Sequence, residues 1–269
     1  MNRKEIEKNI KDTVEKWTAS ITDLDIRKAV KRELIVTGGC ISSMLLNEPV
    51  NDYDIYLRSV DTALRLTRYY VALAGWPSTP IDYTDSGVTI PAVTPMKPLK
   101  QLGELSVVGA YQPVYFTKNA ITLTSGIQIV IRFCGDVEKI HKTFDFAHTK
   151  NYYTPDDGLV LNQFSLEAIL TKELHYAGSG FPLCALFRVN KLIKRGWKIS
   201  ANELMKISYD ISMLDLSDDD VIREQLGGVY GESIACAVSE HEGKMTREKF
   251  FAIMEGYDPM RPEDYGTYN

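Results

Sequence analysis

Two neighbouring stretches decide the fold of this chain, Leu34-Ile35-Val36-Thr37-Gly38-Gly39-Cys40-Ile41-Ser42-Ser43 and Asp52-Tyr53-Asp54-Ile55-Tyr56-Leu57. The first stretch opens with an apolar run containing β-branched residues, which is typical of a buried strand. The paired glycines end this run in a turn, because glycine adopts a positive φ and lets backbone N–H groups approach an anion closely. A helix beginning at about Cys40 would add its N-terminal partial positive charge. The pattern therefore predicts a phosphate-binding turn.

The second stretch places two carboxylates on alternate positions at the start of a strand. Side chains at i and i+2 of a strand point to the same face, so Asp52 and Asp54 are expected to face one site. Magnesium prefers hard oxygen ligands and is typically held by one or two carboxylates together with substrate phosphates. The two stretches together predict a site for a metal-bound nucleoside triphosphate.

The segment from Val36 to Leu57 resembles the signature of the DNA polymerase β-like nucleotidyltransferase superfamily. That signature is Gly-Gly or Gly-Ser after a strand, a helix and turn, and then Asp-x-Asp or Asp-x-Glu between apolar residues. The motif is most similar to the head domain of CCA-adding and poly(A) polymerase-type enzymes, although Ser42-Ser43 stand where Arg-Asp is usual. The resemblance implies an α+β fold with a mixed-sheet core and helices, followed by a helical C-terminal region.

The resemblance also implies roles for individual residues. The turn and the nearby serines would bind the β and γ phosphates, and these residues are Gly38, Gly39, Ser42 and Ser43. Asp52 and Asp54 would hold two Mg²⁺ ions, with Mn²⁺ as a substitute, and a third acid on a later strand would complete the catalytic and metal site.

Asp145 is our choice for the third acid. It lies in Thr143-Phe144-Asp145-Phe146-Ala147, where aromatic neighbours indicate a strand that presents one acid from a buried sheet. An ion pair at a strand end explains the same pattern equally well. The other candidates are Asp82, Asp136 and Glu138.

A basic helix is predicted over residues 183–195. Arg188 and Lys191 recur on it at helical spacing, and in similar enzymes such a helix binds the nucleotide base or the acceptor. We therefore expect both residues to contact the nucleotide, with a solvated helix face as the alternative.

Composition limits the other classes of function. The chain has 269 residues, 44% of them hydrophobic and 25% charged, and a net charge of −5, which argues against a protein that coats nucleic acid. No apolar window of about 18 residues predicts a membrane span, and the N-terminal helix is charged and amphipathic, so we expect a cytoplasmic protein without a membrane partner. Metal-binding His-x-x-His, Gly-x-Ser-x-Gly and P-loop motifs are absent from the sequence.

The pattern of elements predicts two domains. Residues 1–153 form the nucleotidyltransferase domain, with a proline-rich β insertion at about 75–124, and residues 154–269 form a mostly helical domain. The predicted helices and strands of the second half include helices at 162–176 and 231–240, while the insertion includes a strand at 105–108.

The sequence thus predicts an enzyme that transfers a nucleoside monophosphate from ATP or another nucleoside triphosphate to an acceptor hydroxyl and releases pyrophosphate. The acceptor is an RNA 3′ end, such as that of a tRNA, or in the alternative a protein or small molecule modified by a toxin-like or antibiotic-modifying enzyme. A catalytically silent nucleotide-binding or scaffold protein of the same fold is the third reading.

Overall fold

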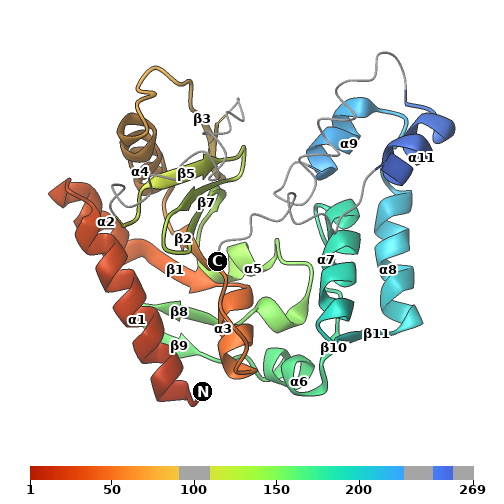
Figure 1. Ribbon diagram of the computed structural model, residues 1–269, viewed down its shortest axis with the longest axis horizontal. Coiled ribbons are helices and arrows are strands. Elements are labelled where there is room, and N and C mark those ends of the chain that lie inside the picture. Colours follow the sequence, from red (N-terminus) through yellow and green to blue (C-terminus); the bar gives the residue numbers. More distant parts are fainter. Residues whose placement is uncertain (91–109, 227–244, 257–269) are drawn as a thin grey trace. The chain divides into compact units, whose positions relative to one another are not determined.

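A computed structural model describes residues 1–90, 110–226 and 245–256 (Figure 1). The chain packs as two units, the first made of Met1–Lys142 and His148–Ile169, the second of Thr143–Ala147 and the residues from Leu170 onward. The strand expected at 105–108, the helix expected at 231–240 and the tail from residue 257 lie outside the described residues. The predicted domain boundary after residue 153 stays a prediction.

The first unit is built on a mixed sheet with the strand order β5-β6-β7-β2-β1-β8-β9. Its strands are β1 (Leu34–Thr37), β2 (Tyr53–Leu57), β5 (Pro113–Phe116), β6 (Ala120–Leu123), β7 (Ile127–Cys134), β8 (Tyr152–Thr154) and β9 (Gly158–Val160). Only the β2–β7 pair is parallel among these seven strands. A separate hairpin pairs β3 (Asp82–Thr84) with β4 (Gly87–Thr89) within the predicted insertion.

The register of the five central strands separates an apolar face from a polar face. One row across β8, β1, β2, β7 and β6 is buried and apolar, and its members are Tyr153, Val36, Ile55, Ile129 and Ile121. The adjacent row across the same strands is polar, and its members are Tyr152, Thr37, Asp54, Gln128 and Thr122. Since successive side chains of a strand point to opposite faces, the first row belongs to the core and the second, which we call the polar row, lies on the other face.

Helices cover the apolar face. They are α1 (Arg3–Ser20), α2 (Leu24–Glu33) and α4 (Val60–Leu73), while the short α3 (Gly39–Leu45) follows β1 and α5 (Val137–His141) follows β7. The buried residues of α1 recur at helical spacing, which is why the helix packs along the sheet as Figure 1 shows. Inside this core, the buried Trp17 Nε1 donates a hydrogen bond of 2.9 Å to the Tyr70 hydroxyl, so both polar atoms are satisfied.

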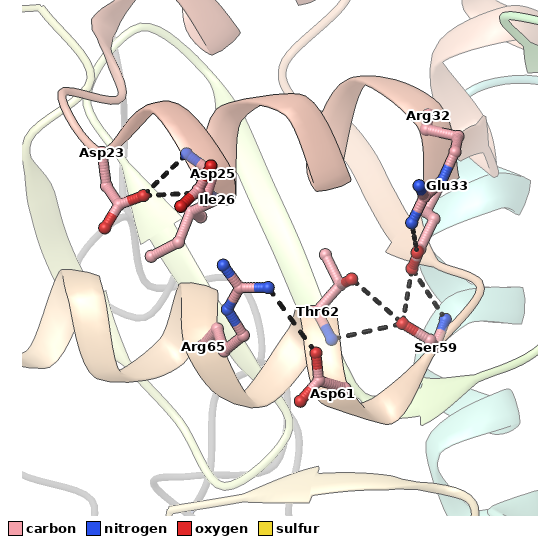
Figure 2. A network of polar contacts seen from close by, with 9 residues as sticks. All are labelled: Asp23, Asp25, Ile26, Arg32, Glu33, Ser59, Asp61, Thr62 and Arg65. Atoms are coloured by element: carbon pink, nitrogen blue, oxygen red, sulfur yellow. Dashed lines mark hydrogen bonds and ion pairs between the residues drawn. The ribbon is translucent and has the colours of Figure 1, made fainter.

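A carboxylate joins the end of α2 to the beginning of α4 (Figure 2). Ser59 is the N-cap of α4, and its Oγ accepts from the Thr62 backbone N–H at 3.2 Å and donates to the Glu33 carboxylate at 2.5 Å. Burial alone would raise the pKa of Glu33, but hydrogen bonds from Ser59, Arg32 and Thr62 outweigh it and lower the pKa. The charged carboxylate of Glu33 therefore links the C-terminal end of α2 to the N-terminal end of α4.

The second unit is helical, with α7 (Pro182–Lys194), α8 (Ala201–Ser212), α9 (Asp219–Leu226) and α11 (Arg247–Gly256) and the short parallel pair β10 (Glu173–Leu174) and β11 (Lys198–Ile199). Its core includes Leu183, Ile222, Leu226, Met245 and Ile253.

The helix predicted over 162–176 is wrong in extent, because α6 covers only Gln163–Thr171. Lys172 has a φ of 53°, which ends the helix and turns the chain into β10.

The predicted fold class is confirmed. A mixed sheet with helices is followed by a helical region, as the α+β prediction states. Within the described parts of the chain, no helix has the length and apolar character needed to cross a bilayer.

Replacing the cap of α4 tests the tie between the helices. We expect Ser59→Ala to lower the free energy of unfolding by about 2 kcal/mol, because it removes both an N-cap and a hydrogen bond to a carboxylate. Asp61→Ala is the matched control in the same turn, since its side chain is 76% exposed, and should change stability by less than about 0.5 kcal/mol. Urea unfolding of both variants measures the difference, and equal costs would contradict the proposed tie.

Candidate active site

The turn after β1 is built around a glycine that no other residue can replace without strain. Gly38 has a φ of +89°, and a Cβ at this position would lie 2.6 Å from Asp54 Oδ2. The carboxylate of Asp54 on β2 therefore packs directly against the Gly38 backbone, as expected from the antiparallel register that pairs Thr37 with Asp54. The sequence predicted that glycines and acids share a site, and the structure brings Gly38 and Asp54 into contact.

The backbone of the next residue, Gly39, has open space beside it. A Cβ on Gly39 would meet no atom within 4 Å, so the approach to its backbone is open. The two serines of the motif, in contrast, are buried. Ser42 Oγ donates to the His148 carbonyl oxygen at 2.7 Å, which uses its only hydroxyl proton. Phosphate binding by Ser42 and Ser43 stays a prediction, and for Ser42 it requires that this bond be exchanged.

The first acid of the Asp-x-Asp motif is positioned by a hairpin turn. Asp52 directly precedes β2, and the Tyr53 N–H donates to the Gly126 carbonyl oxygen at 2.7 Å. Gly126 has a φ of +73°, and a Cβ on it would lie 3.0 Å from the Asn51 carbonyl oxygen. The turn between β6 and β7 can therefore approach the backbone beside Asp52 only because it carries glycine.

The electrostatics of the turn show that both acids act on it. Cys40, the residue after the two glycines, is fully buried, and burial raises the pKa of its thiol, with further increases from the negative charges of Asp54 and Asp52. Cys40 thus stays a neutral thiol, and the charge of this region comes from carboxylates. Their hard oxygens suit Mg²⁺ or Mn²⁺, so the donor chemistry fits the metal that the sequence predicts.

A segment from far along the chain holds the turn in place through main-chain carbonyl oxygens, and no sequence motif predicts these contacts. The Gly38 N–H donates to the Thr149 carbonyl oxygen at 3.2 Å, and Thr37 Oγ1 donates to the Asn151 carbonyl oxygen at 2.7 Å. Together with the bond from Ser42 to His148, these contacts fix residues 148–151 against the end of β1. Main-chain acceptors of this kind carry no side-chain pattern, which is why sequence reasoning missed them.

His141 completes the surroundings of Thr37. Its Nε2 lies 2.9 Å from Thr37 Oγ1, and because that hydroxyl donates to Asn151, the imidazole nitrogen acts as donor. Burial lowers the pKa of His141 to about 4, and the positive charge of Lys150 adds to the effect. The histidine is therefore neutral near pH 7.

Asp145 lies in the second unit, in a loop with a single bridge between Phe146 and Tyr176. The strand predicted for this segment is wrong, because the alternating aromatic residues pack in a loop: the Phe146 ring meets the Tyr176 ring edge to face at 5.8 Å. The carboxylate of Asp145 is buried, accepts from Ser179 Oγ at 2.7 Å and pairs with Arg188. This is the ion pair that the alternative reading expected, and a role as third metal ligand stays a prediction.

The remaining candidates are placed as follows. Arg188 and Lys191 both lie on α7 in the second unit, and nucleotide contact by either stays a prediction. Among the alternative acids, Asp82 is exposed on β3, and Asp136 is the N-cap of α5, where its carboxylate accepts from the Lys139 N–H at 2.8 Å. Glu138 lies in the first turn of α5.

The predicted site residues are divided between the two units of the chain. The glycine turn, its serines and the two acids of the motif belong to the first unit, whereas Asp145, Arg188 and Lys191 belong to the second unit. Residues that sequence reasoning missed are the neighbours of the motif in the polar row, Thr37 and Gln128, and His141.

Comparison with known proteins gives a family. The sequence model of a family described as "Gabija anti-defense 2 family protein" matches residues 8–172. A protein of Bacillus phage SPbetaL7 named "Gabija anti-defense 2" is 25% identical over 210 residues, covering 77% of this chain and 44% of the relative. The chain thus spans less than half the length of this curated relative.

Solved structures similar to the chain include CCA-adding enzymes. The Thermotoga maritima CCA-adding enzyme in complex with tRNA is 14% identical with a TM-score of 0.43, covering 90% of this chain and 53% of the other. A CCA-adding enzyme in complex with CTP is also 14% identical with a TM-score of 0.43, covering 90% of this chain and 54% of the other. The chain spans about half the length of each.

The two glycines of the turn provide a matched pair for mutation. We expect Gly38→Ala to lower the free energy of unfolding by about 2–3 kcal/mol, because the new Cβ meets the Asp54 carboxylate at an unfavourable φ. Gly39→Ala has open space around the new Cβ and should cost less than about 1 kcal/mol. Thermal and denaturant unfolding measure both, and a cost as large for Gly39→Ala would refute this geometry.

His141 makes stability depend on pH. Its pKa falls from an ordinary 6.5 to about 4 in the folded chain, so the unfolded chain binds more protons between these values and stability decreases as the pH falls through this window. After allowance for solvent screening, we expect a loss of about 1–2 kcal/mol between pH 7 and pH 4. His141→Gln should remove this part of the loss in denaturant titrations, and an unchanged pH profile in that variant would show that His141 is not its source.

Proposed function

Because the chain belongs to the Gabija anti-defense 2 family, we propose that it counters the Gabija defence by metal-dependent nucleotidyl transfer. In this reaction an acceptor hydroxyl gives its proton to solvent water, and its oxygen bonds to the α phosphorus of a nucleoside triphosphate. The bond from the α phosphorus to the oxygen bridging to the β phosphorus breaks, and pyrophosphate leaves. The proposal includes membership of the DNA polymerase β-like nucleotidyltransferase superfamily, on the motif between Val36 and Leu57.

The contact of the Asp54 carboxylate with the Gly38 turn carries the proposal. An anion that approaches the open backbone at Gly39 comes close to Asp54 and Asp52, whose negative charges would repel it. A divalent cation between carboxylates and phosphates removes that repulsion, so the arrangement suits a metal–triphosphate complex and disfavours a bare anion.

Each residue has a defined part in this proposal. Asp52 and Asp54 would hold the cations, and the Gly38-Gly39 turn would receive the β and γ phosphates. Mg²⁺ held there would supply orientation of the triphosphate and a lower pKa of the acceptor hydroxyl. Thr37, fixed by Asn151 and His141, holds the end of β1 and with it the turn. Cys40 contributes no charge, since burial keeps it protonated.

The family name directs the choice of acceptor. The relative is named for action against a defence, so we propose a hydroxyl side chain on a protein of that defence as the acceptor, in the cytoplasm where nucleoside triphosphates and Mg²⁺ are available. Transfer to an RNA 3′ end is the second outcome that the experiment below distinguishes. A silent protein that binds a triphosphate without transfer is the third.

Labelled nucleotides test the reaction. The full chain is incubated with each α-labelled nucleoside triphosphate, Mg²⁺ and either the proteins of the defence or total RNA. We expect label in protein, and a loss of at least about 100-fold for Asp52→Asn with Asp54→Asn, because charge stabilisation at the reacting phosphate is removed. Full transfer by the double variant would exclude the proposed site.

Two control variants sharpen this assay. Asp61→Asn makes the same chemical change at a side chain that is 76% exposed on α4 and should keep full transfer. Asp145→Asn tests the third-acid prediction. If Asp145 is a metal ligand, this variant loses transfer while its unfolding temperature stays unchanged. If Asp145 only stabilises the fold through its ion pair with Arg188 and the hydrogen bond from Ser179, the unfolding temperature falls instead.

A further inference from the structure

The side chain beside Asp54 on the neighbouring strand is a neutral amide. The parallel pairing of β2 with β7 sets Asp54 opposite Gln128, and parallel strands lie about 4.8 Å apart. On the other side of Asp54 stands Thr37 of β1. In-register neighbours point to the same face, so the polar row presents Gln128 to the site that Asp54 faces.

The amide of Gln128 is oriented by its other neighbour. Its Nε2 donates to Thr122 Oγ1 at 3.4 Å, and Thr122 lies on β6, the strand on the far side of β7 from Asp54. Because this bond uses the nitrogen on the β6 side, the amide oxygen is left as the end of the side chain that can serve as an acceptor toward β2. Carbonyl oxygens of Gln side chains are accepted ligands of hard divalent cations.

The site has little negative charge of its own. Among the described residues, no group of three or more His, Cys, Asp and Glu side chains is arranged to hold a metal. Asp52 and Asp54 contribute two negative charges, and the protonated Cys40 contributes none. Two divalent cations carry four positive charges, so two such ions in the free protein would leave a large excess of positive charge.

We infer that Gln128 is a third, neutral ligand of the cation site and that its neutrality makes cation binding depend on the triphosphate. This inference rests on the proposed function. The free protein holds one divalent cation weakly, and the negative charge of the triphosphate compensates the second. Cation and nucleotide binding are then positively coupled, and by linkage each raises the affinity of the other by the same factor.

A charge placed at this position tests the inference. We expect Gln128→Glu to bind Mn²⁺ about tenfold more tightly than the native chain in the absence of nucleotide, because a further negative charge lies about 6 Å or less from the ion. Paramagnetic resonance of free Mn²⁺ measures affinity and stoichiometry in the full chain. The coupling between Mn²⁺ and a non-hydrolysable triphosphate should decrease in the same variant.

Tyr152→Glu is the matched control. Tyr152 lies in the same polar row, two strands from Asp54 on the side away from Gln128, so the variant adds the same charge farther from the site and should change Mn²⁺ affinity by no more than about threefold. If Tyr152→Glu tightens Mn²⁺ binding as much as Gln128→Glu does, the effect is one of general charge and a ligand role for Gln128 is overturned. Unchanged affinity in Gln128→Glu would overturn it as well.

Gln128→Met keeps the test valid if the charged variant does not fold. Methionine has similar length and no amide oxygen, so we expect Mn²⁺ to bind at least about threefold more weakly. Native affinity in this variant contradicts the inference.

Asp54→Asn separates this inference from the proposed function. If Asp54→Asn abolishes Mn²⁺ binding while both Gln128 variants bind as the native chain does, the metal site stands and the role of Gln128 fails. If Asp54→Asn binds Mn²⁺ as tightly as the native chain does, the metal site on which the proposed function depends is refuted.

Discussion

The contact between the Asp54 carboxylate and the backbone of Gly38 is the constraint on which the candidate site depends. It exists because β1 and β2 pair in a register that sets Thr37 against Asp54, and because residue 38 has no Cβ to occupy the same volume. A positive φ at Gly38 turns the chain from β1 into α3 at this point. Gly38 therefore has two roles: it adopts the positive φ of the turn, and its lack of a Cβ lets the Asp54 carboxylate approach.

The rest of the first unit holds this contact in place by dividing the sheet into two faces. Ile55 and Ile129 anchor β2 and β7 in the apolar core, so Asp54 and Gln128 one residue earlier must face the other side. On that side, the buried hydroxyl of Thr37 is satisfied by a main-chain atom, because it donates to the Asn151 carbonyl oxygen. Burying a hydroxyl without such a partner would cost about 1–3 kcal/mol, which explains why residues 148–151 pack against the turn.

The second unit shows how one sequence pattern supports two structures. An acid between aromatic residues is typical of a strand that presents one carboxylate, yet Asp145 lies in a loop and binds Ser179 and Arg188. Its partners lie 34 and 43 residues farther along the chain, so no local spacing predicts them. Helix α6 ends at Thr171, earlier than its apolar pattern suggests, because Lys172 adopts a positive φ and the chain continues into β10.

The sequence by itself determined the strand Leu34–Thr37, the glycine turn, the strand with Asp52 and Asp54 at its start, and the main helices, because each is encoded by local periodicity, capping and the conformational freedom of glycine. Only the tertiary structure decided which side chain stands beside Asp54. Gln128 reaches that position through the parallel pairing of β2 with β7, and the free energy of that pairing comes from the shared apolar core, which no short stretch of sequence contains.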